Sequence, residues 1–261
     1  MPEKSNKRLK IHVAPEGVLR VIINRPEKRN ALSRAVMAEI KATFEAHRGD
    51  ETLKLAVLRG AGDKSFAAGG DLRDLEGLRT IDDAEGMAND AKAVFDAIRK
   101  FPVPVVAAVN GDALGGGAEL SVACDLRVMA AHARLGFIQG RLNIATAWGG
   151  GIDLMNLVGP AMGLRLLAAS EMMDAASAVT LGLADAAAAD GQPVDDAVEA
   201  FIAPFLKQAP QVMRAFKAVA LAHRLGLPRA EKETIETEYF ARAWVHDDHW
   251  AAAEKVLGGK S

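Results

Sequence analysis

The hydrophobic pattern of this chain changes its period repeatedly, from two residues to about 3.6 and back. Residues 9–24 alternate apolar and polar side chains on both sides of a Pro-Glu-Gly turn, which predicts a hairpin. Residues 33–47 repeat apolar side chains at helical spacing, with Ser33 placed to cap the helix. The cycle continues through a strand at 54–61, a glycine-rich loop at 62–70, a helix with Ala91, Val94, Phe95 and Ile98 on one face, and strands at 103–111 and 126–131. This alternation predicts an α/β fold with helices packed on sheets.

The last third of the chain has a different texture. Past residue 145 the strand patterns fade, and alanine-rich helical stretches replace them. Residues 228–257 are charged and amphipathic, with Trp244 and Trp250 as the largest apolar groups. Helices of this kind need a partner surface, which is either the chain's own core or a neighbouring subunit.

The charge distribution argues against two classes of partner. The 32 basic and 34 acidic residues of the 261-residue chain are dispersed and give a formal net charge of -2, whereas nucleic-acid binding needs a concentrated basic face. No apolar run approaches the roughly 20 residues of a membrane helix. The single cysteine, Cys124, cannot form an internal disulfide. We therefore expect a cytoplasmic protein with neither a nucleic-acid nor a membrane partner.

Two glycine-rich segments connect strands to helices. Gly111 and the triplet at 115–117 precede one helix, and the small residues of 63–72 precede another, with Asp71 placed to accept hydrogen bonds at the helix cap. One interpretation is that these glycines only permit tight packing of helix on sheet. The other is that both loops offer free backbone N–H groups to one oxygen, as in an oxyanion hole that stabilises a thioester enolate. The dinucleotide and P-loop fingerprints are absent from both segments.

Three segments in register resemble the signatures of the crotonase superfamily, also called the enoyl-CoA hydratase/isomerase family. They are "INRPEKRNALS" (23–33), "FAAGGDL" (66–72) and "NGDALGGGAELSVACD" (110–125). The resemblance implies an α/β core of repeated ββα units over 1–200, and a helical C-terminal region over 201–261 that forms a homotrimer or a dimer of trimers. It also implies an acyl-CoA thioester as substrate, with coenzyme A present only as part of that substrate and no metal.

The resemblance also implies a set of site residues. Gly70 and Gly116 would donate the two N–H groups of the oxyanion hole, and Glu119 matches one of the two catalytic glutamates of hydratases. The residues expected to contact CoA or the thioester are Lys28, Arg29, Asn30, Ala31, Ala68, Gly69, Gly70, Asp71, Leu72 and Gly116. Lys28 and Arg29 are candidate phosphate partners, although exposed cations are usually only solvated.

The chain departs from the family pattern at the second glutamate, where an ungapped match places Gln139. An amide can orient a water molecule, but it cannot give or take the proton that hydration moves. Arg141 and Asn143 are nearby polar residues that could substitute. Glu119 itself could be a solvated helix residue, but its small and apolar neighbours favour a buried role.

Several reactions remain compatible with these residues. We expect a CoA-thioester lyase of the hydratase type that acts through a stabilised enolate. The segments "ALGGGAEL", "ACDLRVM" and "AWGG" also resemble ethylmalonyl-CoA decarboxylase, another member of the superfamily, and decarboxylation needs the oxyanion hole without two carboxylates. Double-bond isomerisation with Glu119 as the only proton shuttle is a further alternative. A non-catalytic acyl-CoA binder is the last, since such a protein would also lack the second glutamate.

Overall fold

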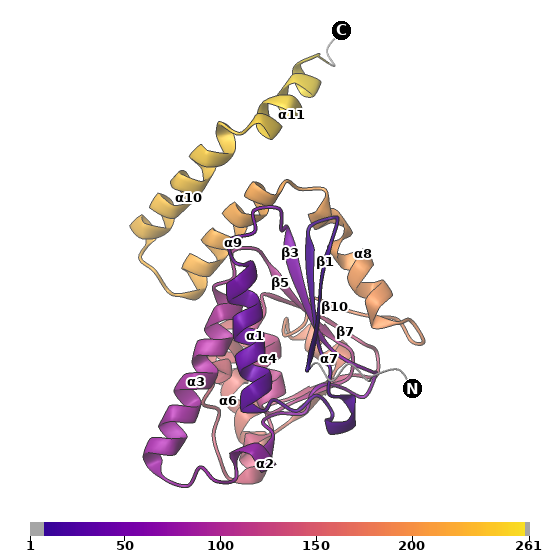
Figure 1. Cartoon of the computed structure of the whole chain (residues 1–261), viewed down its shortest axis with the longest axis vertical. Helices are drawn as coiled ribbons and strands as arrows, with labels where there is room; N and C mark the ends of the chain where they lie inside the picture. Colours follow the sequence, from indigo (N-terminus) through magenta and orange to yellow (C-terminus); the bar gives the residue numbers. More distant parts are fainter. Residues whose placement is uncertain (1–7, 259–261) are drawn as a thin grey trace.

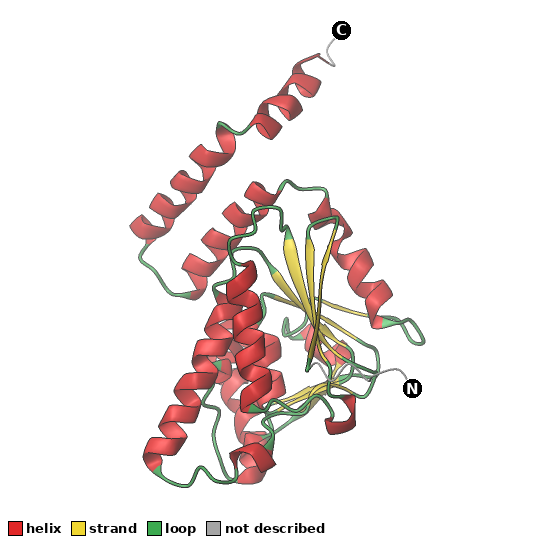
Figure 2. Ribbon diagram, viewed as in Figure 1, coloured by secondary structure: helices red, strands yellow, loops and turns green. Residues whose placement is uncertain are grey.

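A computed structural model describes residues 8–258 as an α/β body from which a helical arm extends (Figures 1 and 2). The predicted hairpin is confirmed, because β1 (Leu9–Ala14) and β2 (Val18–Ile23) pair antiparallel. The main sheet continues in parallel through the next strands in the order β1-β2-β3-β5-β7-β10. Its remaining members are β3 (Leu55–Gly60), β5 (Val105–Val109), β7 (Leu126–Met129) and β10 (Ala186–Ala187).

A second sheet of short strands lies against the first and was not predicted. Its order is β4-β6-β8-β9, with β4 (Ser65–Ala67), β6 (Asp112–Leu114), β8 (Arg134–Gly136) and β9 (Met172–Asp174). The loop expected over 62–70 therefore contains a strand, and β6 separates Asn110 from the glycine triplet. Three residues are too few to show a period of two, so these strands leave no clear sequence signal. A ββα unit consists of a strand of the main sheet, a short strand of the second sheet and a helix. β5, β6 and α4 (Gly116–Ala123) form such a unit.

Most helices of the body lie on one side of the main sheet, whereas α8 (Val194–Leu206) packs against β5, β7 and β10 on the other (Figure 1). α1 (Arg34–His47) begins at the predicted cap, because Ser33 Oγ accepts a hydrogen bond from Val36 N at 3.3 Å. α3 (Ile81–Arg99) buries the predicted apolar face and packs beside α1. The other helices of the body are η1 (Pro26–Lys28), α2 (Leu72–Leu75), η2 (Gln139–Leu142), α5 (Gly150–Val158), α6 (Pro160–Ala169) and α7 (Ala175–Thr180). In residues 8–258 no helix is long and apolar enough to cross a membrane.

The C-terminal region is helical, as predicted, and consists of α8 (Val194–Leu206), α9 (Pro210–Arg224), α10 (Arg229–Trp244) and α11 (Asp247–Gly258). The boundary expected at residue 200 falls inside α8, which buries Val198 and Ile202 against the core. α10 packs on α9, and α11 extends away from the body (Figure 1). No side chain of α10 or α11 is buried.

Candidate active site

The two glycine-rich loops lie side by side because β4 and β6 are parallel neighbours. A Cβ atom on Gly69 would lie 3.6 Å from Gly116 N, so the loops touch through their backbones. Gly117 must lack a side chain, because its Cβ would lie 1.9 Å from Ala67 O. The glycines therefore do permit close packing, as the first interpretation held, and this packing is what brings Gly70 and Gly116 together.

Gly70 and Gly116 line one cavity of about 260 Å³. Within residues 8–258 neither backbone N–H donates a hydrogen bond to another backbone group. Gly116 is the first residue of α4, where the helix dipole adds a partial positive charge. The cavity thus holds two unpaired donors, as the second interpretation requires. Their action on a thioester oxygen remains a prediction.

Glu119 is buried in the first turn of α4, with 2% of its surface exposed, and lines the same cavity. Its Oε1 accepts hydrogen bonds from Trp148 N at 3.0 Å and Gly150 N at 3.1 Å. A Cβ on Gly150 would lie 2.3 Å from Cγ of Glu119, so only glycine permits this approach. Glu119 is therefore not a solvated surface charge.

Burial raises the pKa of Glu119 above its ordinary value, because the charged carboxylate loses its hydration. The hydrogen bonds from Trp148, Gly150 and Gln139 lower the pKa, as does the positive charge of Arg99, but they offset only part of that increase. A carboxyl group with a raised pKa is suited to taking up and returning a proton.

Gln139 lies at the start of η2 and faces Glu119, as the ungapped match predicts. Its Nε2 donates a hydrogen bond to Glu119 Oε2 at 2.9 Å, and both residues line the cavity. Gln139 is 8% exposed, and its Oε1 has no hydrogen-bond partner within the described part of the chain. Gln139 therefore carries a buried acceptor without a protein partner next to Glu119.

Trp148 is a site residue that the sequence analysis did not identify. Its indole lies against both glycines, since a Cβ on Gly116 would be 2.1 Å from Cζ3 and one on Gly70 would be 3.3 Å from Cη2. It also meets the ring of Phe95 edge-on at 5.7 Å. The only available signal was the segment "AWGG", which does not show which residues the ring contacts.

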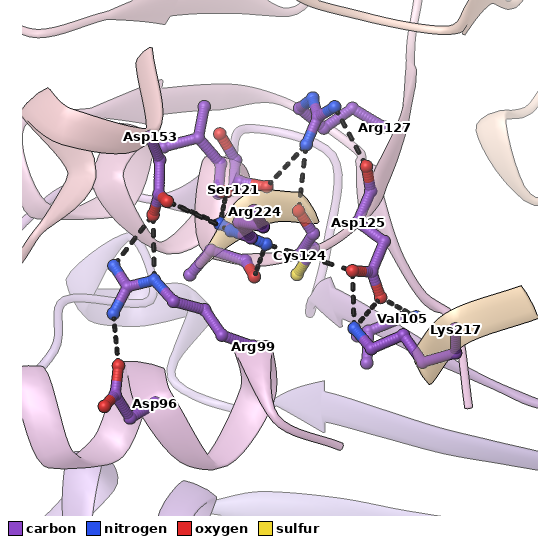
Figure 3. A network of polar contacts seen from close by, with 12 residues as sticks. Asp96, Arg99, Val105, Ser121, Cys124, Asp125, Arg127, Asp153, Lys217 and Arg224 are labelled. Atoms are coloured by element: carbon purple, nitrogen blue, oxygen red, sulfur yellow. Dashed lines mark hydrogen bonds and ion pairs between the residues drawn. The ribbon is translucent and has the colours of Figure 1, made fainter. Parts of the chain in front are cut away.

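A buried ionic network supports the backbone that binds Glu119 (Figure 3). Arg99 donates from Nε to Asp153 Oδ2 at 2.8 Å and from Nη2 to the Trp148 carbonyl at 3.0 Å. Arg224 of α9 donates to Asp153 Oδ1 at 3.1 Å and to the Val122 carbonyl at the end of α4. Arg224 thus connects α9 directly to the end of α4, the helix that carries Glu119. Through Asp153 and Arg99 it also connects α9 to the Trp148 backbone.

Lys217 provides a second connection between α9 and the core in the same network, because it pairs with Asp125 (Figure 3). Asp125 accepts a hydrogen bond from Val105 N at 2.8 Å as well. These contacts place α9 firmly on the ends of α4 and β5.

The residues expected to contact CoA separate into two groups. Asn30 is buried. Its Oδ1 accepts a hydrogen bond from Arg25 N, and its Nδ2 donates to the carbonyl groups of Ala61 and Ser65. It therefore holds the loop together and does not face a ligand. Ala31 and Ala68 also take part in the loop through backbone hydrogen bonds. Lys28, Arg29 and Leu72 are exposed, and Ala31 is half-buried. The expected residues that line the cavity are Ala68, Gly69, Gly70, Leu72 and Gly116.

Asp71 is at the N-cap position of α2, as predicted, but its side chain does not make the expected capping hydrogen bond, so this part of the prediction is wrong. Its carboxylate instead accepts a hydrogen bond from Arg25 Nη2 at 3.0 Å and lies 3.8 Å from Lys28 Nζ. Burial acts to raise the pKa of Asp71, but the Arg25 hydrogen bond and the charges of Lys28 and Arg25 together lower it. Asp71 thus fixes the two loops to each other.

The two polar residues considered as substitutes for the second glutamate lie on the exposed side of the site. Arg141 lines the cavity while its guanidinium donates to the Ser170 carbonyl at 2.7 Å. Asn143 is exposed and ends η2 in the left-handed conformation, with φ of 57°. No group of three His, Cys, Asp or Glu side chains in residues 8–258 could hold a metal ion.

These features define a class of α/β protein in which two ββα units present glycine N–H groups and a buried glutamate to one cavity. The family model described as enoyl-CoA hydratase/isomerase matches residues 14–254. The chain belongs to the enoyl-CoA hydratase/isomerase family.

Individual relatives agree with this assignment. A crotonyl-CoA hydratase from Syntrophomonas wolfei is 40% identical over 161 residues, and the match spans only 62% of each chain. A putative enoyl-CoA hydratase from Thermus thermophilus is 32% identical over 240 residues, which cover 91% of this chain and 92% of the relative. The crystal structure of an enoyl-CoA hydratase from Mycobacterium smegmatis superposes with a TM-score of 0.89 at 25% identity and covers 97% of both chains. The expected crotonase-type fold is confirmed.

Proposed function

We propose that this protein hydrates a 2-enoyl-CoA thioester with Glu119 as its only acid–base group. The observation that carries the proposal is the buried Glu119 carboxylate, held by Gln139 in a cavity that also contains the Gly70 and Gly116 N–H groups. The relatives named as hydratases support the same reaction class.

The reaction follows from the groups in the cavity. The thioester oxygen accepts hydrogen bonds from the two glycine N–H groups, which stabilise the negative charge that develops there. A water molecule donates one hydrogen bond to Gln139 Oε1 and the other to Glu119. As the water oxygen adds to the β carbon, Glu119 takes its proton, and the electrons of the double bond move to the thioester oxygen. Glu119 then returns this proton to the α carbon, so that one water molecule is added in total.

A decarboxylase is the second candidate, and Arg141 is the observation that favours it. Arg141 lines the cavity, and a guanidinium that also donates to the Ser170 carbonyl has further N–H groups with which it could bind the carboxylate of a malonyl-CoA-type substrate such as ethylmalonyl-CoA or methylmalonyl-CoA. Loss of CO2 would produce the same enolate at the glycine N–H groups, and Glu119 in its protonated form would protonate it. An ionised Glu119 would repel such a substrate, so we rank hydration first.

We infer that Lys28 and Arg29 bind the phosphates of CoA, because both are exposed beside the loops that carry Gly70. The exposed apolar side chains of α10 and α11, among them Phe240, Trp244 and Trp250, support self-association into a homotrimer. The cytoplasmic location stays a prediction.

A thioester panel tests the proposal. Purified protein is incubated with crotonyl-CoA, a 3-enoyl-CoA, ethylmalonyl-CoA and methylmalonyl-CoA, and the products are identified by mass spectrometry. We expect 3-hydroxybutyryl-CoA from crotonyl-CoA as the fastest product. Faster CO2 release would favour the decarboxylase, and a faster double-bond shift the isomerase. Binding without any turnover would identify a non-catalytic acyl-CoA binder.

A further inference from the structure

A second and larger cavity shares a wall with the catalytic cavity. Its volume is about 580 Å³, compared with about 260 Å³ for the catalytic cavity. The larger cavity lies between α1 and α3, and the two cavities have Leu75, Met87 and Trp148 in common. Small-molecule sites usually measure roughly 300 to 1,000 Å³, so only the larger cavity reaches that range alone.

The chemistry of the second cavity suits an apolar occupant. Its buried lining is apolar and consists of Leu32, Met37, Ala91, Val94 and Trp148. Five charged residues also line it: Arg34, Asp82 and Asp90 are exposed, and Lys41 and Asp83 are half-buried. Charged groups at the rim keep their hydration while an apolar group fills the interior.

Whereas Leu75 contacts the position of Gly70, Trp148 is the residue of the shared wall that contacts both glycines of the predicted thioester site. Its ring contacts the positions of both Gly70 and Gly116, and it is held from the α3 side by Phe95. An acyl chain whose carbonyl oxygen is bound by those glycines therefore meets the indole after a few carbons. The ring thus lines both cavities at the place where a longer chain would pass from one to the other.

We propose that Trp148 closes the catalytic cavity against the second cavity and restricts this protein to short-chain acyl-CoA thioesters. The second cavity is then an acyl-tail site that becomes accessible when the indole is removed. The proposal rests on the proposed acyl-CoA site, but it does not depend on which reaction occurs there.

Equilibrium binding of butyryl-CoA and decanoyl-CoA tests this proposal. Both are saturated, so neither can be hydrated, and the readout is independent of turnover. The central variant is Trp148→Ala. In a double variant, Gly86→Phe is added, because Gly86 lines the second cavity from α3 and a Cβ there would meet nothing within 4 Å. The matched control adds Gly49→Phe, where a Cβ is equally unhindered but which does not line this cavity.

We expect Trp148→Ala to raise the affinity for decanoyl-CoA relative to butyryl-CoA by at least about tenfold, the effect of burying roughly two methylene groups. Gly86→Phe should reverse this gain, and Gly49→Phe should not. An unchanged ratio in a folded Trp148→Ala variant would overturn the proposal, as would a wild-type protein that binds neither ligand. If Trp148→Ala does not fold, Trp148→Leu provides the same comparison. A shifted ratio together with no hydration would refute the proposed reaction alone.

Discussion

Gln139 donates a hydrogen bond from Nε2 to Oε2 of Glu119 over 2.9 Å. The amide of Gln139 thus occupies the position at which hydratases of this family have their second carboxylate. Because the amide is uncharged, the pair avoids the repulsion between two buried carboxylates. It also leaves Glu119 as the only group of the pair that can exchange a proton.

Gln139→Glu should make the stability of the protein depend more strongly on pH. Two carboxyl groups at this distance would share a proton, and the pKa of the pair would rise further above the unfolded value. A raised pKa in the folded state favours folding at low pH, and that contribution is lost as the pH rises from the unfolded to the folded pKa. Thermal unfolding at pH 5 and pH 8 measures the effect. Gln139→Met adds no second carboxyl group and only removes the hydrogen bond that lowers the pKa of Glu119, so its pH response should be smaller than that of Gln139→Glu. An equal pH response of both variants would contradict the prediction.

The rate of hydration should fall with decreasing pH around a midpoint above 4.5, the ordinary pKa of the Glu119 side chain. The reaction needs the ionised carboxylate to take a proton from water, and burial raises the pH at which it ionises. The measurement is kcat/KM for crotonyl-CoA between about pH 4.5 and pH 8. A rate that stays constant down to the lower limit would show that the carboxylate is not the base.

Arg99→Met should lower kcat and move the acid limb of the pH profile to higher pH. The change removes the hydrogen bond to the Trp148 carbonyl and the positive charge that lowers the pKa of Glu119. Misplacing a catalytic group by a small distance can cost roughly a hundredfold in rate.

Arg99→Lys separates the two effects, because lysine keeps the charge but cannot make the same set of hydrogen bonds. It should restore the pH midpoint more fully than kcat. The exposed Arg165 provides a control, and Arg165→Met should change neither value. If Arg99→Met leaves the pH midpoint in place, Arg99 has only a structural role.

Asp71→Ala should lower the free energy of unfolding by about 3 kcal/mol at neutral pH, because it leaves the largely buried Arg25 without its carboxylate partner. The folded-state pKa of Asp71 is lowered, so its contribution is present above the unfolded pKa and is lost as the pH falls through the folded value. The difference between variant and wild type in urea unfolding should therefore shrink in acid. The exposed Asp82→Ala is the control, and an equally large loss there would contradict the assignment.

The sequence predicted the features that depend on local pattern or on motif order. The hairpin, the cap at Ser33 and the buried face of α3 follow from short-range periodicity. The meeting of Gly70, Gly116, Glu119 and Gln139 followed from a resemblance over three motifs, and the structure brings these residues to one cavity.

Other features could not be read from the sequence because they depend on contacts between distant residues. Trp148 reaches the glycines across 32 or more positions, and no local pattern encodes that contact. Asn30 and Asp71 are polar loop residues, and their types do not show whether they bond the protein or a ligand. The structure shows that both bond the protein, through Arg25 and neighbouring backbone groups.

The central claim is that a single carboxylate at Glu119 performs the hydration, and Glu119→Gln tests it most directly. A glutamine at position 119 has nearly the same size as glutamate, and its side-chain oxygen can still accept the hydrogen bonds from Trp148 N and Gly150 N. The amide of Gln139 can rotate so that its oxygen accepts a hydrogen bond from the amide introduced at position 119. The measurement is kcat for crotonyl-CoA hydration in the wild type and the variant, together with the affinity for butyryl-CoA. We predict a fall in kcat of roughly a hundredfold to ten-thousandfold with unchanged affinity. Hydration that continues at the wild-type rate in Glu119→Gln would contradict the account.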